Sequence, residues 1–174
     1  RERIDPVGTW EDERRGSPGV AGYWQAVAED WTGYDCDKPW SAAFISWLMV
    51  EAGVPAGDFT PSGLHADYLR DIGRRQQQPG ARFALRDARS YAPKPGDLIC
   101  ATRAGASIPA FDRIPDGTPM HCDLVVAVDG TRLESIGGNV RNSVSKTMRQ
   151  VDGLGRLDLA AERPWVLVVE TLFP

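Results

Sequence analysis

The longest apolar run in the chain is the feature that most constrains its fold. Residues 42–50 are apolar except for Ser46, and Gly53 follows shortly after them. Glycine is favoured just beyond a helix C-terminus, where the backbone turns left-handed. A helix that is apolar on nearly every side must be buried on most of them. We therefore predict a central buried helix that begins near Ser41, and the run is too short to span a membrane.

The second half of the chain has the pattern of strands. Five segments rich in β-formers are bounded by Gly, Pro or Asp, namely 97–102, 122–128, 132–136, 143–149 and 165–172. Asp129-Gly130, between two of them, is a strong signal for a hairpin turn. Helices followed by hairpin-connected strands predict an α+β domain with a mainly antiparallel sheet.

Two further helices are expected beside the central one. Residues 21–31 carry aromatic and aliphatic side chains at helical spacing, and Thr60-Pro61 offers an N-cap followed by a proline at the first helical position. Residues 74–94 are predicted as a polar connection with at most a short element. The charged residues 1–20 are predicted to form an N-terminal arm, which leaves 21–174 as a single domain, a reasonable size for one core.

Charge and cysteine usage exclude some classes of function. The net charge is −4 and the basic residues are scattered, which argues against a nucleic-acid partner. Three cysteines are too few for a scaffold built on disulfides. Cys100 and Cys122 lie on neighbouring predicted strands, so a disulfide and a pair of buried thiols are both compatible with the sequence.

The candidate catalytic residues follow from a short list of bases. The chain has two histidines, and His121 stands at a junction between a loop and a strand, where catalytic groups are often held. Ser41 begins the central helix, whose free N–H groups favour developing negative charge. Asn139 ends the strand that comes after the one begun by His121, and it is predicted to orient the ring of His121. Ser41, His121 and Asn139 thus form a candidate catalytic set that needs no cofactor.

Other polar residues are predicted to surround this set. Asp123 is expected on the same strand face as His121, where it could bind an amine of the substrate or an arginine. Glu134 is the alternative candidate for orienting His121 if Asn139 points away from the ring. The predicted substrate-binding residues are His65, Tyr68, Asp123 and Trp40.

Some of these residues could instead have a purely structural or solvent-exposed role. His65 is equally read as a packed histidine of the core, and Arg103 either meets a carboxylate of an acidic peptide or is simply solvated. A metal site is not expected, because His121 and Cys122 point to opposite faces of a strand. The chain also lacks the His-x-x-x-His and Cys-x-x-Cys spacings.

Four segments in order resemble the NlpC-type and CHAP-type cell-wall peptidases and amidases. Residues 40–54 are similar to the catalytic helix of those families, and Pro95-Gly96-Asp97-Leu98-Ile99 is similar to one of their strand starts. Residues 121–126 resemble their His-led strand, and residues 136–140 resemble the Gly-Gly-Asn ending of an endolysin-like branch. The resemblance covers residues 38–148, and its nearest members are expected among uncharacterised bacterial proteins with the same Pro-Trp-Ser-Ala start.

The resemblance implies a fold and a substrate. It implies a papain-like α+β domain in which the nucleophile attacks a peptide or amide carbonyl of a peptidoglycan stem peptide. It also implies a periplasmic or secreted setting, with any export signal lying before residue 1. Which bond is cleaved, the oligomeric state and the existence of an immunity or inhibitor protein are left open by the sequence.

Ser41 stands where those families have a cysteine. A cysteine at a helix N-terminus beside an imidazole exists largely as thiolate, whereas a serine must lose its proton during attack. Four interpretations stay open: a working serine nucleophile, an inactive module that binds the peptide, an engineered replacement of cysteine, or a transfer of the role to Cys36. The working hypothesis is the serine nucleophile.

Overall fold

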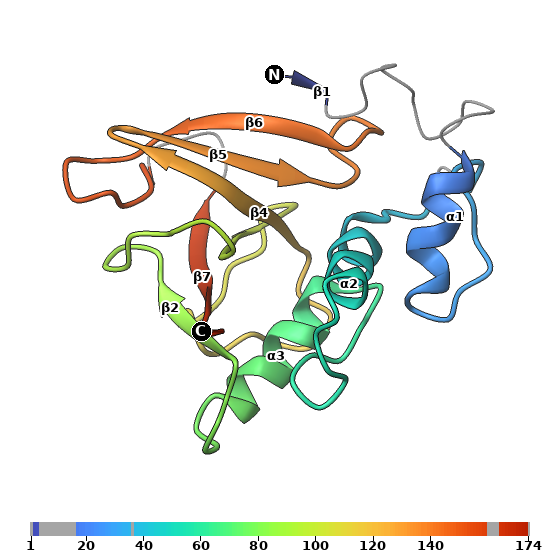
Figure 1. Cartoon of the computed structure of the whole chain (residues 1–174), viewed down its shortest axis with the longest axis horizontal. Helices are drawn as coiled ribbons and strands as arrows, with labels where there is room; N and C mark the ends of the chain where they lie inside the picture. Colours follow the sequence, from blue (N-terminus) through green and yellow to red (C-terminus); the bar gives the residue numbers. More distant parts are fainter. Residues whose placement is uncertain (1, 4–16, 36, 160–163, 174) are drawn as a thin grey trace.

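Antiparallel pairing joins the strands into one sheet, with helices packed beside it (Figure 1). The structure is a computed structural model that describes residues 2–3, 17–35, 37–159 and 164–173. The helices in these ranges are α1 (Ser17–Gln25), α2 (Ser41–Glu51) and α3 (His65–Arg75). The strands are β1 (Glu2–Arg3), β2 (Phe83–Asp87), β3 (Leu98–Thr102), β4 (Met120–Asp129), β5 (Arg132–Gly137), β6 (Ser145–Gln150) and β7 (Trp165–Thr171). Their order is β1-β6-β5-β4-β3-β7-β2, so the predicted α+β class is confirmed.

Helix α2 is the buried central helix that the apolar run predicts. The helix begins at Ser41, and most of its side chains are buried against α1, β4 and β5. Gly53 has a φ of 71° and donates its N–H to the carbonyl of Val50 at 2.9 Å, while Val54 donates to Met49 at 3.0 Å. These two bonds form a Schellman motif, which satisfies carbonyls that the helix end would leave unpaired.

Strand β4 lies at the middle of the sheet and supports the site. It pairs with β3 on one side and β5 on the other, and it packs against α2 and α3. Cys100 on β3 lies opposite Cys122 on β4, and a disulfide joins their sulfur atoms. Of the two alternatives left open by the sequence, the structure shows the disulfide.

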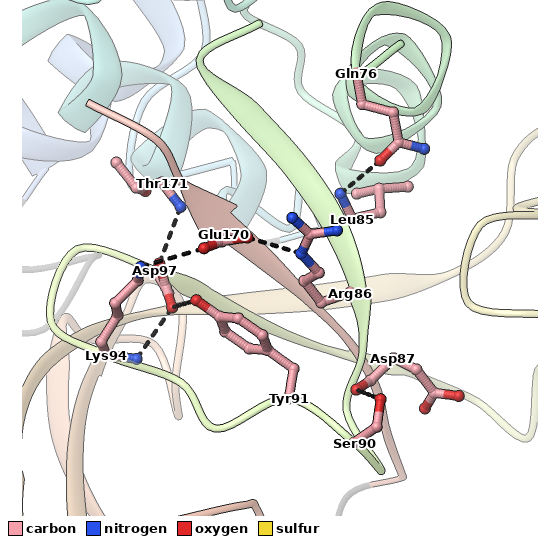
Figure 2. A network of polar contacts seen from close by, with 10 residues as sticks. All are labelled: Gln76, Leu85, Arg86, Asp87, Ser90, Tyr91, Lys94, Asp97, Glu170 and Thr171. Carbon is pink, nitrogen blue, oxygen red and sulfur yellow. Dashed lines mark hydrogen bonds and ion pairs between the residues drawn. The ribbon is translucent and has the colours of Figure 1, made fainter. Parts of the chain in front are cut away.

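Asp97 explains the Pro-Gly-Asp motif at the start of β3. Its buried carboxylate accepts hydrogen bonds from the backbone N–H groups of Lys94 (3.0 Å) and Thr171 (2.9 Å) and from the hydroxyl of Tyr91 (3.1 Å) (Figure 2). Burial raises the pKa of Asp97, and these hydrogen bonds oppose the rise. Gly96 adopts a φ of 96°, a conformation that suits glycine. The motif thus ties the start of β3 to the end of β7.

Two predicted helix starts are wrong. Helix α1 begins at Ser17, whose buried hydroxyl accepts the N–H of Gly33 at 3.2 Å, so the predicted arm of residues 1–20 overlaps the folded domain. Helix α3 begins at His65 with Leu64 as its N-cap, and not at Thr60-Pro61. Residue 62 is held away from the helix because its backbone exchanges two hydrogen bonds with the hydroxyl of Ser46 on α2.

Strand β2 lies within the segment predicted as a polar connection. It pairs with β7, and Phe83 and Leu85 are buried in the core. The side chain of Gln76, just beyond α3, accepts the N–H of Leu85 at 2.8 Å (Figure 2). Arg86 also contacts Glu170 of β7 at 2.7 Å (Figure 2). These partners are distant in sequence, so the local pattern of residues 74–94 does not reveal the strand. No helix in the described ranges is long and apolar enough to cross a membrane.

Candidate active site

The N-termini of α2 and α3 bring a serine and a histidine together. Ser41 Oγ lies 2.8 Å from Nε2 of His65, and the two side chains are only 2% and 5% exposed. Nδ1 of His65 lies 2.5 Å from the hydroxyl of Tyr68, one helical turn further along α3. Ser41, His65 and Tyr68 therefore form a continuous hydrogen-bonded line, which we call the Ser41 line.

The surroundings of the Ser41 line keep both of its titratable groups neutral. Burial holds the pKa of His65 well below its usual value, the charges of His121 and Arg103 lower it further, and Asp123 opposes them. Burial, aided by the charge of Asp123, holds the pKa of the Tyr68 phenol well above its usual value. At neutral pH, His65 is therefore an uncharged imidazole that can accept a proton.

The second histidine belongs to a charged cluster beside the first. His121 Nε2 lies 2.7 Å from Asp123 Oδ1, and the rings of His121 and His65 are 5.6 Å apart between centroids. Asp123 Oδ2 accepts hydrogen bonds from Arg149 at 2.7 Å and from Ser135 at 3.2 Å. Burial favours the neutral acid, but His121 and Arg149 outweigh it and hold the pKa of Asp123 well below its usual value.

The two glycines before Asn139 are needed for close packing. A Cβ at residue 137 would lie 2.1 Å from Asp123 Oδ1, and one at residue 138 would lie 2.6 Å from the Cβ of Phe44. Asn139 follows in the left-handed region, with a φ of 53°. Asp123, which the sequence predicts on the same strand face as His121, contacts Nε2 of that ring. The predicted role of Asn139 in orienting the ring stays a prediction. The Gly-Gly signal thus marks the tight contact of β5 with Asp123 and α2.

A cavity of about 500 Å³ opens beside the Ser41 line. Its walls come from the start of α2, the residues before α3, the end of β3 and the loop that leads into β4. The residues that define it include Ser41, Leu64, His65, Arg103, Thr118 and Met120. Volumes of this size are typical of sites for small ligands. The serine hydroxyl is thus recessed and still lines a cavity.

Several predicted site residues lie elsewhere. Trp40, predicted to bind substrate, is 2% exposed, packs against Tyr23 with ring centroids 5.4 Å apart, and does not line the cavity. Glu134 forms an ion pair with Lys146 at 3.3 Å. Its neighbour Ser135 points to Asp123, so Glu134 points to the opposite face and cannot orient His121.

Tyr68 and Asp123 lie beside the cavity residues, and Asp123 binds an arginine, one of its two predicted partners, through Arg149 at 2.7 Å. Both side chains are 1% exposed, and neither lines the cavity. They contact the two histidine rings instead. Cys36, the alternative nucleophile, lies outside the described residues.

His65 is the site residue whose role the sequence left most open. It lines the cavity, as the prediction of a substrate cleft required, and it also contacts the serine hydroxyl directly. The signal that could have found it is the small number of histidines in the chain. Within the described residues, no group of three or more His, Cys, Asp or Glu side chains is arranged to hold a metal ion.

Comparison with known proteins places the chain in a family. Residues 15–169 match a protein-family profile described as an uncharacterized protein conserved in bacteria (DUF2272). The matched range runs from before α1 into β7 and includes Ser41 and both histidines. No curated protein and no solved structure matches the chain. Because the match covers most of the sequence, the chain belongs to the DUF2272 family.

Proposed function

We propose that this protein is a serine hydrolase that cleaves an acyl bond, with Ser41 as the nucleophile and His65 as the general base. The observation that carries the proposal is the Ser41 line, in which the hydroxyl lies 2.8 Å from an imidazole nitrogen and both side chains line a cavity. A nucleophile within hydrogen-bond reach of a base, with the base held by a third group, is the recurring arrangement of such enzymes.

The proposed reaction proceeds in two balanced halves. Ser41 Oγ bonds to the carbonyl carbon while its proton passes to Nε2 of His65. His65 then gives that proton to the leaving nitrogen or oxygen as its bond to carbon breaks, and an acyl-serine remains. Water repeats the sequence in the second half: it loses a proton to His65, bonds to the carbonyl carbon and releases the acid. The proton on His65 finally returns to Ser41 Oγ.

The start of α2 can stabilise the oxyanion of this reaction. The N-cap residue Trp40 makes no side-chain capping bond, and the first helical N–H with a backbone acceptor is that of Phe44, which donates to Trp40 at 2.9 Å. The N–H groups of the preceding turn have no acceptor within the helix. They lie beside the nucleophile at the positive end of the helix dipole, where developing negative charge is favoured.

Tyr68 takes the position that a carboxylate holds in many serine hydrolases. For His65 to accept a proton at Nε2, its other proton must reside on Nδ1 and be donated to the oxygen of Tyr68. A neutral phenol orients the ring but stabilises the imidazolium less than a carboxylate would. The negative charge of Asp123 supplies part of that stabilisation, because it raises the pKa of His65.

The substrate in this proposal comes from the resemblance of residues 38–148 to cell-wall peptidases and amidases. That resemblance supports an amide bond of a peptidoglycan stem peptide, a papain-like domain and a location outside the cytoplasm. The assignment of His121 as the general base stays a prediction from the sequence. The contact between Ser41 and His65 favours His65 for that role.

A small phosphonate probe tests the proposal. Wild-type protein should gain one phosphonyl group on Ser41, measured by intact mass and peptide mapping, and Ser41→Ala should gain none. His65→Gln should react about a hundredfold more slowly, because loss of a general base typically costs that much or more. Cys36→Ser is the matched control and should react like wild type.

The outcome with purified cell wall separates an enzyme from a binding module. Release of soluble peptides by wild type, and none by Ser41→Ala, supports the hydrolase. Absence of both phosphonylation and peptide release, together with retention of the protein on cell wall, would instead support a module that binds the peptide without cleaving it. If His121→Gln abolished phosphonylation and His65→Gln did not, the base would be His121.

A further inference from the structure

The cavity beside the Ser41 line carries a positive charge without a negative one. Arg103, the first residue after β3, lines the cavity together with Ser41 and His65, and its side chain is exposed. Among the described residues, those that line the cavity include no aspartate or glutamate. A cavity with this lining is electrostatically suited to an anion.

Arg103 is not engaged by other side chains in the described part of the chain. No ion pair or side-chain hydrogen bond links its guanidinium to a described residue. Asp116, on the loop that leads into β4, pairs with Arg70. Asp123 is engaged by His121 and Arg149. Both of these carboxylates therefore have partners other than Arg103.

The backbone of Arg103 is fixed although its guanidinium is not. Its N–H donates to the carbonyl of Pro119 at 2.8 Å, and its own carbonyl accepts the N–H of Ala106 at 2.9 Å. Pro119 belongs to the loop that leads into β4 and also lines the cavity, so these bonds fix the backbone of the arginine to that loop. A guanidinium on a fixed backbone offers a planar pair of donors that matches a carboxylate.

We propose that Arg103 binds a carboxylate of the substrate, so that the cavity selects acyl compounds with a free carboxylate near the bond that is cleaved. This inference rests on the proposed serine hydrolase and names the class of substrate for it. A bound carboxylate also assists the chemistry: it neutralises the charge of Arg103, which otherwise disfavours the imidazolium of His65 that forms during attack.

A pair of matched esters tests the selection. The p-nitrophenyl ester of glutaric acid has a free carboxylate, and its methyl ester has the same chain without the charge. Wild type should hydrolyse the acid with a kcat/KM about tenfold or more above that of the methyl ester, as expected for one charge-assisted pair. Arg103→Gln should bring this ratio close to one, and Arg103→Lys should retain part of it.

A second arginine provides the control for charge alone. Arg132→Gln removes the same charge from an exposed position on β5 that does not line the cavity, and it should keep the wild-type ratio. Measurements near physiological salt suppress long-range attraction between substrate and protein. Equal rates for the two esters in wild type, or a preference that Arg103→Gln leaves unchanged, would overturn the inference while leaving the hydrolase in place.

A binding measurement decides the inference even without turnover. Monomethyl glutarate should bind the Ser41→Ala protein about tenfold more tightly than it binds Ser41→Ala/Arg103→Gln, as measured by calorimetry. Equal binding to the two proteins would overturn the role of Arg103. If neither ester is hydrolysed and no phosphonate is attached, the proposed function fails, and this comparison alone tests the carboxylate site.

Discussion

Ser41 and His65 occupy the same position in their helices, and this has an electrostatic consequence. Each is the first residue of its helix, so both lie where the helix dipole is positive. That field favours an oxyanion beside Ser41 and disfavours a proton on His65. Burial and the charge of Arg103 act on His65 in the same direction. In the proposed mechanism, the site would therefore favour the oxyanion while its imidazole is only weakly basic.

The pH profile of the proposed hydrolase reaction should report this weak base. Because the pKa of His65 is lowered, the imidazole becomes protonated only at a pH below 6.5. The acid limb of kcat/KM should therefore have its midpoint below that value. Arg103→Gln should move the midpoint upward, because it removes a charge that lowers this pKa. The profile is measured with the uncharged methyl ester between about pH 4 and pH 8.

A midpoint at or above the usual value of free histidine would contradict the assignment of His65. Arg132→Gln, which removes a charge away from the cavity, should leave the midpoint where wild type has it.

The sequence identifies the chemical groups of the site but not how they pair. Ser41 is predictable because it begins an apolar helix, and the bases are predictable because histidine is rare in this chain. The pairing of Ser41 with His65 depends on residue 62, whose backbone exchanges hydrogen bonds with Ser46 at 2.9 and 3.0 Å and so brings the start of α3 to the start of α2. No periodic pattern encodes such a contact.

The elements differ in how far local sequence determines them. Helix α2 is predicted well, because its apolar run and the glycine at its end act locally. Strands β3 to β7 also lie near their predicted positions, since each is bounded by turn residues. Strand β2 is missed because it is held by β7 and by Gln76, which are remote partners.

The contact between the residue just after β5 and α2 gives a prediction for the second of the paired glycines. Gly138→Ala places a Cβ 2.6 Å from the Cβ of Phe44, an atom close to the backbone that cannot rotate away. Overpacking of this kind typically costs about 1–3 kcal/mol, so the free energy of unfolding measured with urea should fall by about that amount.

Gly57→Ala is the matched control for this substitution. A Cβ at residue 57 meets no atom within 4 Å, so the free energy of unfolding should change little. If the two variants were equally stable, the close approach of Gly138 to Phe44 on α2 would be refuted.

Helices α2 and α3 both pack against strand β4 (Figure 1), and the side chains of His65, His121 and Asp123 are buried in the fold. The stability of the fold should therefore depend on pH. The pKa of His65 in the folded state lies below its usual value of 6.5, so the unfolded chain binds a proton first as the pH falls. Stability is then lost from about pH 6.5 downward, until the pH reaches the folded pKa.

Asp123 adds a second loss at lower pH. Its pKa is held below the usual value of 3.8, so the stability that it contributes is present above that pH and is lost as the pH falls further. Urea unfolding at a series of pH values measures both phases. His65→Gln should remove the upper phase and keep the lower one, whereas identical pH dependence in wild type and variant would show that His65 is not buried as described.

The disulfide between β3 and β4 makes the opening of the site observable over time. Both cysteines are fully buried, and the strands that they join carry His121 and lead directly to Arg103. A dissolved reductant reaches these sulfurs only in molecules whose strands have briefly separated. The rate at which free thiols appear under native conditions thus measures how often β3 and β4 separate. A ligand held in the cavity would lower that rate.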